Sequence, residues 1–185
     1  MLTKKVGLDT LVKFRQGDAT RMPFDNAMFD LVWTQHASMN IANETGLYCE
    51  MHRVLKCISD NAKDVKRQGT LAVYDIYKGN NYDDSSFHLP VPWPSHTSSS
   101  FLVYPEDALG ALHDAGFKKI IWDDKTGDAL KWFREMMTER FQEVRNASWQ
   151  LGLQIIVGPR WQTMVQNLLK NYEEGQIVLV QGIFK

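Results

Sequence analysis

An acidic turn, followed by a second apolar stretch, contains the residues best placed to bind a ligand. The stretch Leu11–Arg15 runs into Gly17-Asp18-Ala19, and after a Pro-containing loop another apolar stretch begins at Phe29-Asp30. We predict strands over Leu11–Arg15 and Phe29–Thr34, the second of the buried kind found in parallel sheets. Asp18 would then lie at the carboxyl end of a strand, the edge where open α/β sheets bind ligands.

The elements that must position this turn alternate along the chain. Further strands are predicted over Thr70–Ile76, Lys118–Asp123 and Ile177–Phe184. Helices are predicted where apolar residues recur at helical spacing, or where a cap, a first-turn proline or a terminal glycine marks an end. They span Asn43–Lys56, Pro105–Ala115, Ala129–Arg145 and Arg160–Tyr172, and Met1–Leu8 has the pattern of a helix tail. This order predicts an α/β protein with a mostly parallel sheet and helices on both faces.

Two irregular segments interrupt what we predict to be a single domain over residues 1–185. Residues 57–68 are polar and without period, which indicates a surface insertion. Residues 78–100 are rich in Asn, Asp, Pro, Ser and Gly, but they also contain Phe87, Val91 and Trp93. Those apolar side chains favour an ordered, lid-like segment over a disordered one.

The overall composition bounds the class of protein. Hydrophobic residues make up 44% of the 185, charged residues 23%, and the net charge of −1 gives no electrostatic case for binding nucleic acid or an anionic membrane. No apolar run approaches the roughly 20 residues of a membrane helix, and the first residues lack a signal-peptide core. Cys49 and Cys57 have no metal-ligand spacing, so they indicate reduced thiols. We therefore expect a cytoplasmic protein without a metal site.

A series of short motifs runs through nearly the whole chain in a characteristic order. They are Gly17-Asp18-Ala19, Met22-Pro23-Phe24, Phe29-Asp30 with Trp33–His36, Met39-Asn40-Ile41, Glu50–Lys56, Gly69-Thr70-Leu71, Pro90–Trp93 and Ala115-Gly116-Phe117. This order resembles the class I S-adenosylmethionine-dependent methyltransferases, most closely the small-molecule enzymes of the sarcosine/dimethylglycine and tocopherol type. The resemblance implies a Rossmann-like methyltransferase sheet whose last two strands form an antiparallel pair.

One feature of that family is missing from this sequence. Its members carry a glycine-rich turn after their first strand, and no glycine-rich loop occurs in these residues. The resemblance therefore implies an N-terminally truncated domain, with two strands and the loop falling in roughly 80–100 residues ahead of Met1. The family's third strand, here Val12–Phe14, would then lack its neighbours. We expect it to pair with another segment, to slide against Phe29–Trp33, or to stay exposed.

The resemblance also implies where S-adenosylmethionine would bind. Gly17, Asp18 and Ala19 take the adenine-binding position, where the carboxylate accepts from the exocyclic amine and the next backbone N–H donates to a ring nitrogen. The alternative is that Asp18 is an ordinary strand-to-turn residue. Met22 either packs on the adenine ring or fills the core. In the family, the backbone corresponding to Thr34, Gln35 and His36 faces the methionine portion of the cofactor.

His36 is the candidate catalytic residue, although the base remains unassigned. An amine must be neutral to attack the sulfonium methyl, and an imidazole can take its proton. Taken alone, a histidine at a strand end is more often a structural hydrogen-bonding group. Methyl transfer also needs little help from a base, because an aligned nucleophile and a strong electrophile account for most of the barrier.

Candidate acceptor-binding residues lie on three segments. Met39 and Asn40 either border the acceptor or start the following helix. Trp93 and His96 belong to the lid-like segment, where an aromatic face could hold a methylated ammonium, or Trp93 could simply pack the loop. Arg160 could pair with a substrate carboxylate or serve only packing.

Three functions are consistent with these residues. The first is methyl transfer to a small-molecule acceptor, for example an amine such as sarcosine or dimethylglycine. The second is a non-catalytic fragment, a pseudoenzyme, or one half of a split enzyme that needs a partner chain. The third is a binding domain that reuses the fold. The partners we expect are a small-molecule methyl acceptor and either a second copy or a complementing chain, with no nucleic acid and no membrane.

Overall fold

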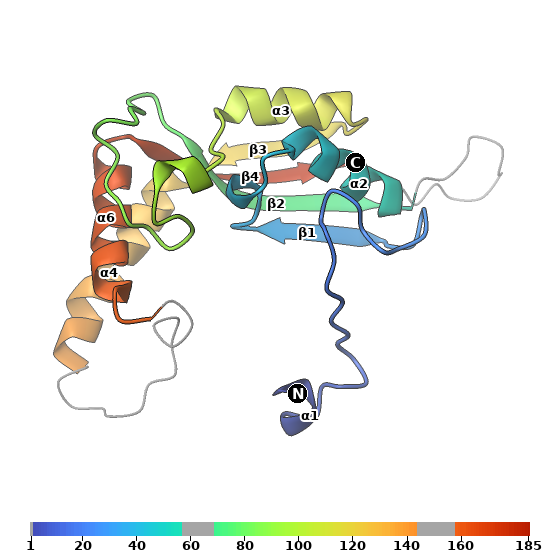
Figure 1. Ribbon diagram of the computed structural model, residues 1–185, viewed down its shortest axis with the longest axis horizontal. Helices are drawn as coiled ribbons and strands as arrows, with labels where there is room; N and C mark the ends of the chain where they lie inside the picture. Colours follow the sequence, from blue (N-terminus) through green and yellow to red (C-terminus); the bar gives the residue numbers. More distant parts are fainter. Residues whose placement is uncertain (1, 57–68, 144–157) are drawn as a thin grey trace.

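A four-stranded mixed sheet forms the centre of the computed structural model, which describes residues 2–56, 69–143 and 158–185 (Figure 1). The strands β1 (Leu31–Gln35), β2 (Thr70–Lys78), β3 (Lys119–Asp124) and β4 (Ile177–Phe184) lie in the order β1-β2-β4-β3. β1 runs parallel to β2, whereas β4 is antiparallel to both β2 and β3. The antiparallel pair of the last two strands, which the resemblance implies, is therefore confirmed.

The expectation of a mostly parallel sheet is wrong for the described strands. Two of the three strand pairs are antiparallel, because β4 inserts between β2 and β3 and runs against both. The turn at Gly175, where φ is +71°, sends the chain from the last helix directly into β4.

The described helices largely match the predicted ones. They are α1 (Leu2–Lys5), α2 (Glu44–Val54), α3 (Pro105–Asp114), α4 (Thr126–Glu143) and α6 (Trp161–Glu173), with short 3₁₀ turns at Ser38–Asn40 and Thr97–Ser99. The side chain of Asn43 caps α2 by accepting from the N–H of Gly46, and Pro105 opens α3. α4 begins three residues before the predicted Ala129, because Asp124 accepts from the N–H of Thr126 and caps an earlier turn.

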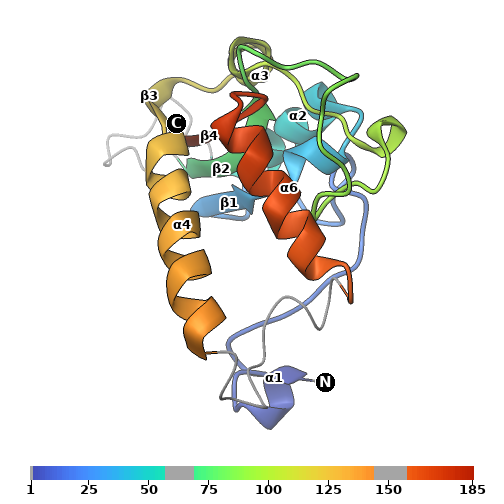
Figure 2. The ribbon, with the colours of Figure 1, turned by 90° about the vertical axis from the view of Figure 1, so that its left-hand side faces the viewer.

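Helices cover both faces of the sheet, as predicted. Figure 2 shows α2 on one side of the strands and α4 on the other, with α6 beside α4. Alternate side chains of β2 point to opposite faces of the sheet. Leu71 and Val73 pack in a cluster with α2 and α3, whereas Ile76 packs in a cluster with α4 and α6. On the α4 side of β1, however, Leu31 and Trp33 are 57% and 68% exposed.

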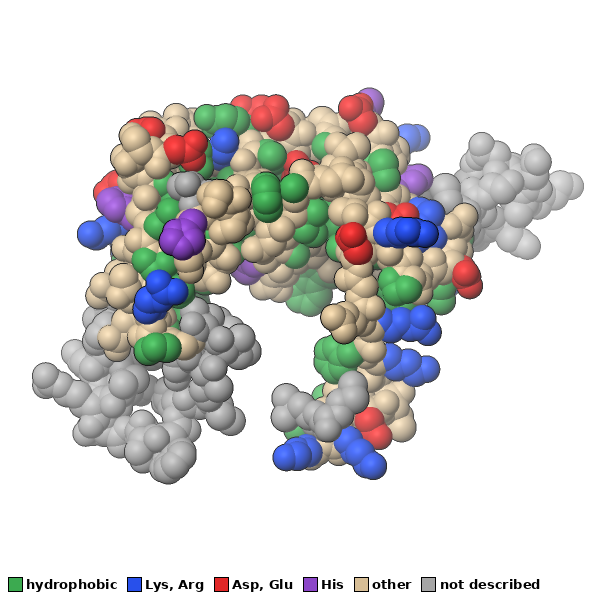
Figure 3. Space-filling view, in the orientation of Figure 1, with side chains coloured by type: hydrophobic (Ala, Val, Ile, Leu, Met, Phe, Trp, Pro, Cys, Tyr) green, Lys and Arg blue, Asp and Glu red, His purple; other side chains and the backbone are tan. Residues whose placement is uncertain are grey.

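The predicted strand over Leu11–Arg15 does not form. The segment runs away from the sheet as a separate limb that ends at α1 (Figures 1 and 3), and its backbone bonds are local, from the N–H groups of Leu11 and Val12 to Leu8. Phe14 is 69% exposed. A strand exists only where a neighbour completes its ladder, and none is described beside this segment. The expectation that Val12–Phe14 stays exposed is confirmed.

Between the end of β2 and Ser100 the chain is irregular apart from the turn at Thr97–Ser99, and hydrogen bonds join it to α6. Asn171 of α6 is fully buried; its side chain accepts from the N–H of His88 and donates to the His88 carbonyl, both at 3.0 Å. Asn167, one turn earlier, donates to the Pro90 carbonyl. Phe87 and Val91 are buried in the same cluster as α6. The segment is therefore fixed to α6, and a lid function stays a prediction. The predicted insertion at 57–68 lies outside the described residues.

Candidate active site

The chain leaves β1 through a strained residue, His36. Its φ is +50°, and its N–H donates to the carbonyl of Tyr74 at 3.0 Å. Few residues other than glycine adopt this left-handed conformation, although histidine does so more readily than most. Such strain persists only where the surrounding structure imposes it, and it concentrates at functional sites.

A buried carboxylate lies beneath this loop. Asp75 on β2 is fully buried, and its Oδ2 accepts from the N–H groups of Ala37 at 3.2 Å and Ser38 at 3.0 Å. Burial raises the pKa of Asp75, and the N–H groups that donate to it oppose this rise. The sequence analysis missed this residue. The available signal was a lone acidic side chain inside the apolar run Thr70–Ile76.

Hydroxyl groups and a second acid gather around Asp75. The buried Tyr48 donates its hydroxyl to Glu44 at 2.8 Å. The Tyr77 hydroxyl, near Ser38 and Tyr48, forms no hydrogen bond within the described part of the chain. Burial raises the pKa of Glu44, Tyr48 and Tyr77.

The buried hydroxyl of Thr34, at the end of β1, is also without a partner among the described residues. The site is therefore a polar interior at the carboxyl ends of β1 and β2.

The His36 side chain is exposed at the surface of the loop. Surrounding protein atoms lower its pKa by partial desolvation, which favours the neutral ring, and the charge of Asp75 opposes this. The ring packs edge-on against Tyr74, with centroids 5.6 Å apart. A neutral imidazole can accept a proton, so the base role stays a prediction beside the structural contact with Tyr74.

The Asp18 turn presents an acceptor beside a donor. Its Oδ1 accepts from the N–H and the hydroxyl of Thr20, both at 2.8 Å, and these bonds lower the pKa of Asp18. The other carboxylate oxygen and the N–H of Ala19 bond to no described residue. A side chain at Gly17 would place its Cβ 2.9 Å from the ring of Pro23, so the turn requires glycine. This pair of groups fits the edge of an adenine, which presents an amine and a ring nitrogen.

Two side chains of α2 hold the loop that follows this turn. Glu50 accepts from the N–H of Met22 at 2.7 Å, and Arg53 donates to the carbonyls of Met22 and Phe24 at 3.1 and 2.8 Å. Glu50 and Arg53 also pair with each other at 2.7 Å. Ala19 and Met22 pack against the cluster that includes α2, which favours the core-filling alternative for Met22.

We expect Arg53→Ala to destabilise the protein through this loop. The carbonyls of Met22 and Phe24 would lose their donor, and Glu50 would lose its partner, so the melting temperature should fall by about 3–6 °C. Thermal unfolding followed by circular dichroism measures this. Lys131→Ala, at an exposed position of α4, is the matched control. If Arg53→Ala had the same melting temperature as the wild type, the contacts of Arg53 would contribute nothing to stability.

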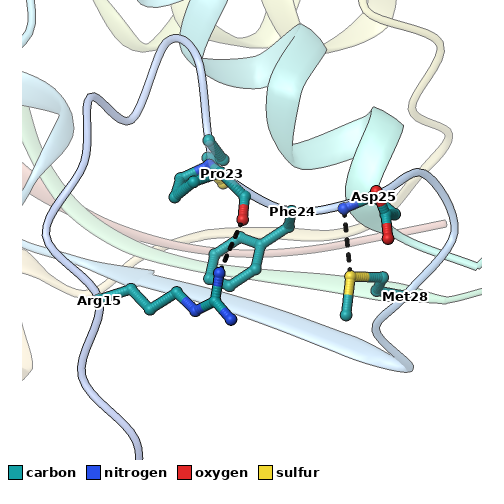
Figure 4. Close-up of a pocket in the computed structure, with 6 residues that line it drawn as sticks. Arg15, Pro23, Phe24, Asp25 and Met28 are labelled. Carbon is teal, nitrogen blue, oxygen red and sulfur yellow. Dashed lines mark hydrogen bonds between the residues drawn. The ribbon is translucent and has the colours of Figure 1, made fainter.

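A hollow of about 360 Å³ lies under the same loop (Figure 4). The guanidinium of Arg15 sits 5.6 Å from the ring centre of Phe24 and donates to the Pro23 carbonyl at 3.3 Å. Of the predicted site residues only Met22 lines this hollow. It therefore does not bring Asp18 and His36 together.

The predicted acceptor residues divide between core and surface. Met39 is 2% exposed in the cluster with α6, and Trp93 packs on that cluster, which favours the packing alternative for both. Arg160, at the start of α6, donates to Ser95 at 3.5 Å and so lies beside the lid-like segment. The remaining predicted residues are exposed: Gln35, Asn40 and His96.

The described residues contain neither a candidate membrane span nor a candidate metal-ion site. None of their helices has the length and apolar character to cross a membrane. Among the same residues, no group of three or more His, Cys, Asp or Glu side chains could hold a metal ion.

Sequence comparisons relate the chain to methyltransferases. The family described as "Methyltransferase domain" matches residues 1–57. The sterol 24-C-methyltransferase ERG6A of Gibberella zeae is 26% identical over 134 residues, which are 70% of this chain and 32% of that protein. The chain thus spans about a third of the length of the curated relatives it matches.

Solved structures share the fold. A Galdieria sulphuraria protein assigned as a sarcosine dimethylglycine methyltransferase superposes with a TM-score of 0.72 at 14% identity, covering 99% of this chain and 62% of that one. Geranyl diphosphate C-methyltransferase from Streptomyces coelicolor A3(2), bound to S-adenosyl-L-homocysteine, gives a TM-score of 0.64 at 16% identity, covering 99% of this chain and 57% of that one. The chain is thus similar to the "Methyltransferase domain" family over residues 1–57, and it shares its fold with structures of methyltransferases.

Proposed function

We propose that this chain takes part in S-adenosylmethionine-dependent methyl transfer to a small-molecule acceptor. The observation that carries the proposal is the arrangement at the carboxyl ends of β1 and β2, where the strained His36 loop lies over the buried Asp75. The relatives, which are named as methyltransferases, do not favour the alternative of a non-catalytic fragment.

We assign the cofactor contacts from the free groups of the Asp18 turn. The uncommitted carboxylate oxygen of Asp18 would accept from the adenine amine, and the N–H of Ala19 would donate to a ring nitrogen. Gly17 permits that turn. Thr34, Gln35 and His36, at the end of β1, would border the methionine portion. When bound, S-adenosylmethionine supplies the electrophilic methyl group, and these residues hold and orient it.

For the acceptor we propose an amine such as sarcosine or dimethylglycine. An amine must lose its proton before it attacks, and the neutral ring of His36 is able to accept one. Asn40 and the partly buried Trp93 would border the acceptor, with Met39 packed behind them. Arg160, beside the lid-like segment, and His96, within that segment, would meet its carboxylate.

A second acceptor class is an apolar molecule of the sterol type. The curated sequence relatives favour it, since they are sterol 24-C-methyltransferases. An alkene carbon has no proton to lose before attack, so His36 would matter little to the transfer step itself. The dependence of methyl transfer on His36 therefore distinguishes an amine acceptor from a sterol-type acceptor.

Transfer of a labelled methyl group tests the proposal. The chain is fused behind the N-terminal half of the Streptomyces coelicolor enzyme, which supplies a glycine-rich turn, and is assayed with dimethylglycine, sarcosine, a sterol and geranyl diphosphate. We expect transfer to an amine and a roughly tenfold loss in His36→Gln. His113→Gln, an exposed histidine on α3, is the matched control. Transfer to the sterol alone, unaffected by His36→Gln, would replace the amine proposal, and a fusion that binds the cofactor but methylates nothing would refute the function.

A further inference from the structure

We propose that Asp75 is a positioning residue for the acceptor side of the site: its carboxylate fixes the loop from His36 to Asn40 by holding two successive backbone N–H groups. The effect on methyl transfer rests on the proposed function. The effect on the loop does not, because it follows from contacts within the chain.

The carboxylate of Asp75 is held in a fixed position because Asp75 lies on a central strand. β2 pairs with β1 on one side and with β4 on the other, and Asp75 itself stands opposite Val180. Its Oδ2 takes the N–H groups of Ala37 and Ser38, and its Oδ1 accepts from its own neighbour Ile76 at 3.1 Å. The loop is therefore tied to the middle of the sheet and not to another loop.

Three successive N–H groups of the loop reach two successive residues of β2. The N–H of His36 bonds to Tyr74, and the next two bond to Asp75. The left-handed conformation of His36 costs free energy that these contacts must offset. Without the carboxylate, the N–H groups of Ala37 and Ser38 would lose their acceptor, and His36 could relax.

A role in stability alone would not require a carboxyl group here. Asp75 is fully buried, and its burial raises its pKa, so the polar group is kept in the interior at a cost in desolvation. The acid Glu44 and the hydroxyls of Ser38, Tyr48 and Tyr77 face the same interior. An apolar side chain would fill the site without that cost, but it could not hold the two N–H groups.

Amide hydrogen exchange of the 185-residue chain, measured by NMR, tests the contact directly. In Asp75→Ala, we expect exchange at Ala37 and Ser38 to become about 10- to 100-fold faster, with exchange at Met22, held separately by Glu50, unchanged. Asp75→Asn keeps an oxygen acceptor and should give a smaller effect. Asp123→Ala, at an exposed position of β3, is the matched control.

The outcomes separate this inference from the proposed function. Unchanged exchange at Ala37 and Ser38 in a folded variant would overturn the positioning role, whatever the activity. If Asp75→Ala does not fold, Asp75→Leu, which has nearly the same shape and no acceptor, decides in the same way. In the active fusion, we expect Asp75→Ala to lower kcat at least tenfold and to leave the KM for S-adenosylmethionine within twofold. Faster exchange in a fusion that transfers no methyl group would preserve the positioning of the loop and refute only the function.

Discussion

S-adenosylmethionine should bind the 185-residue chain by itself with a Kd of about 1 mM or weaker. In the proposed site, the Asp18 turn would offer the adenine one acceptor and one donor, and Thr34–His36 would border the methionine portion. The sequence contains no glycine-rich turn to meet the ribose hydroxyls and the amino-acid carboxylate. Each missing hydrogen bond is worth about 0.5–3 kcal/mol, and about 1.4 kcal/mol changes the affinity tenfold. Several missing bonds therefore weaken binding by orders of magnitude.

Isothermal titration of the chain and of its fusion to a glycine-rich half checks this prediction. The fusion should bind at least 100-fold more tightly. Asp18→Asn keeps an oxygen that can accept from Thr20, but it replaces the free acceptor with a donor. It should therefore weaken the binding of S-adenosylmethionine to the fusion about tenfold and change the binding to the isolated chain little. Asp25→Asn, in the same loop, is the matched control. Micromolar binding by the isolated chain, abolished by Asp18→Asn, would contradict the prediction.

Local patterns in the sequence predicted the helices and most strands. Asn43 and Pro105 mark the starts of α2 and α3 through contacts within a few residues, which sequence spacing records directly. Leu11–Arg15 has the same local pattern as a strand, but no neighbour is described beside it, and pattern alone cannot supply one. The direction of β4 depended on the turn at Gly175 and on the neighbours it meets.

The site was harder to predict because its contacts are long-range. Asp75 reaches Ala37 and Ser38 across 38 and 37 positions of sequence, so no spacing rule connects them. Met39 follows a strand end, as a ligand-binding residue would, yet it is buried by side chains from the lid-like segment and from α6. The resemblance pointed to the carboxyl edge of the sheet as the site, and the structure was needed to show which side chains hold the loop at that edge.

The isolated chain should also associate with itself through β1. This strand forms one edge of the described sheet, and Leu31 and Trp33, two positions apart, present 57% and 68% exposed side chains on the same face. Figure 3 shows hydrophobic surface on the N-terminal limb near that edge, where Leu11 is 79% exposed. An open edge beside apolar side chains pairs readily with another strand, and a lysine there opposes such pairing.

We therefore expect the wild-type chain to form dimers or larger species at tens of micromolar, an order-of-magnitude expectation for apolar strand edges. Trp33→Lys should weaken this association at least tenfold, because the charge would have to be desolvated at the contact. Sedimentation velocity over a concentration series measures it. Trp132→Lys is the matched control, since Trp132 is 57% exposed on α4 and away from the edge. A chain that stays monomeric at several hundred micromolar, or an equal effect of both substitutions, would show that the β1 edge does not drive association.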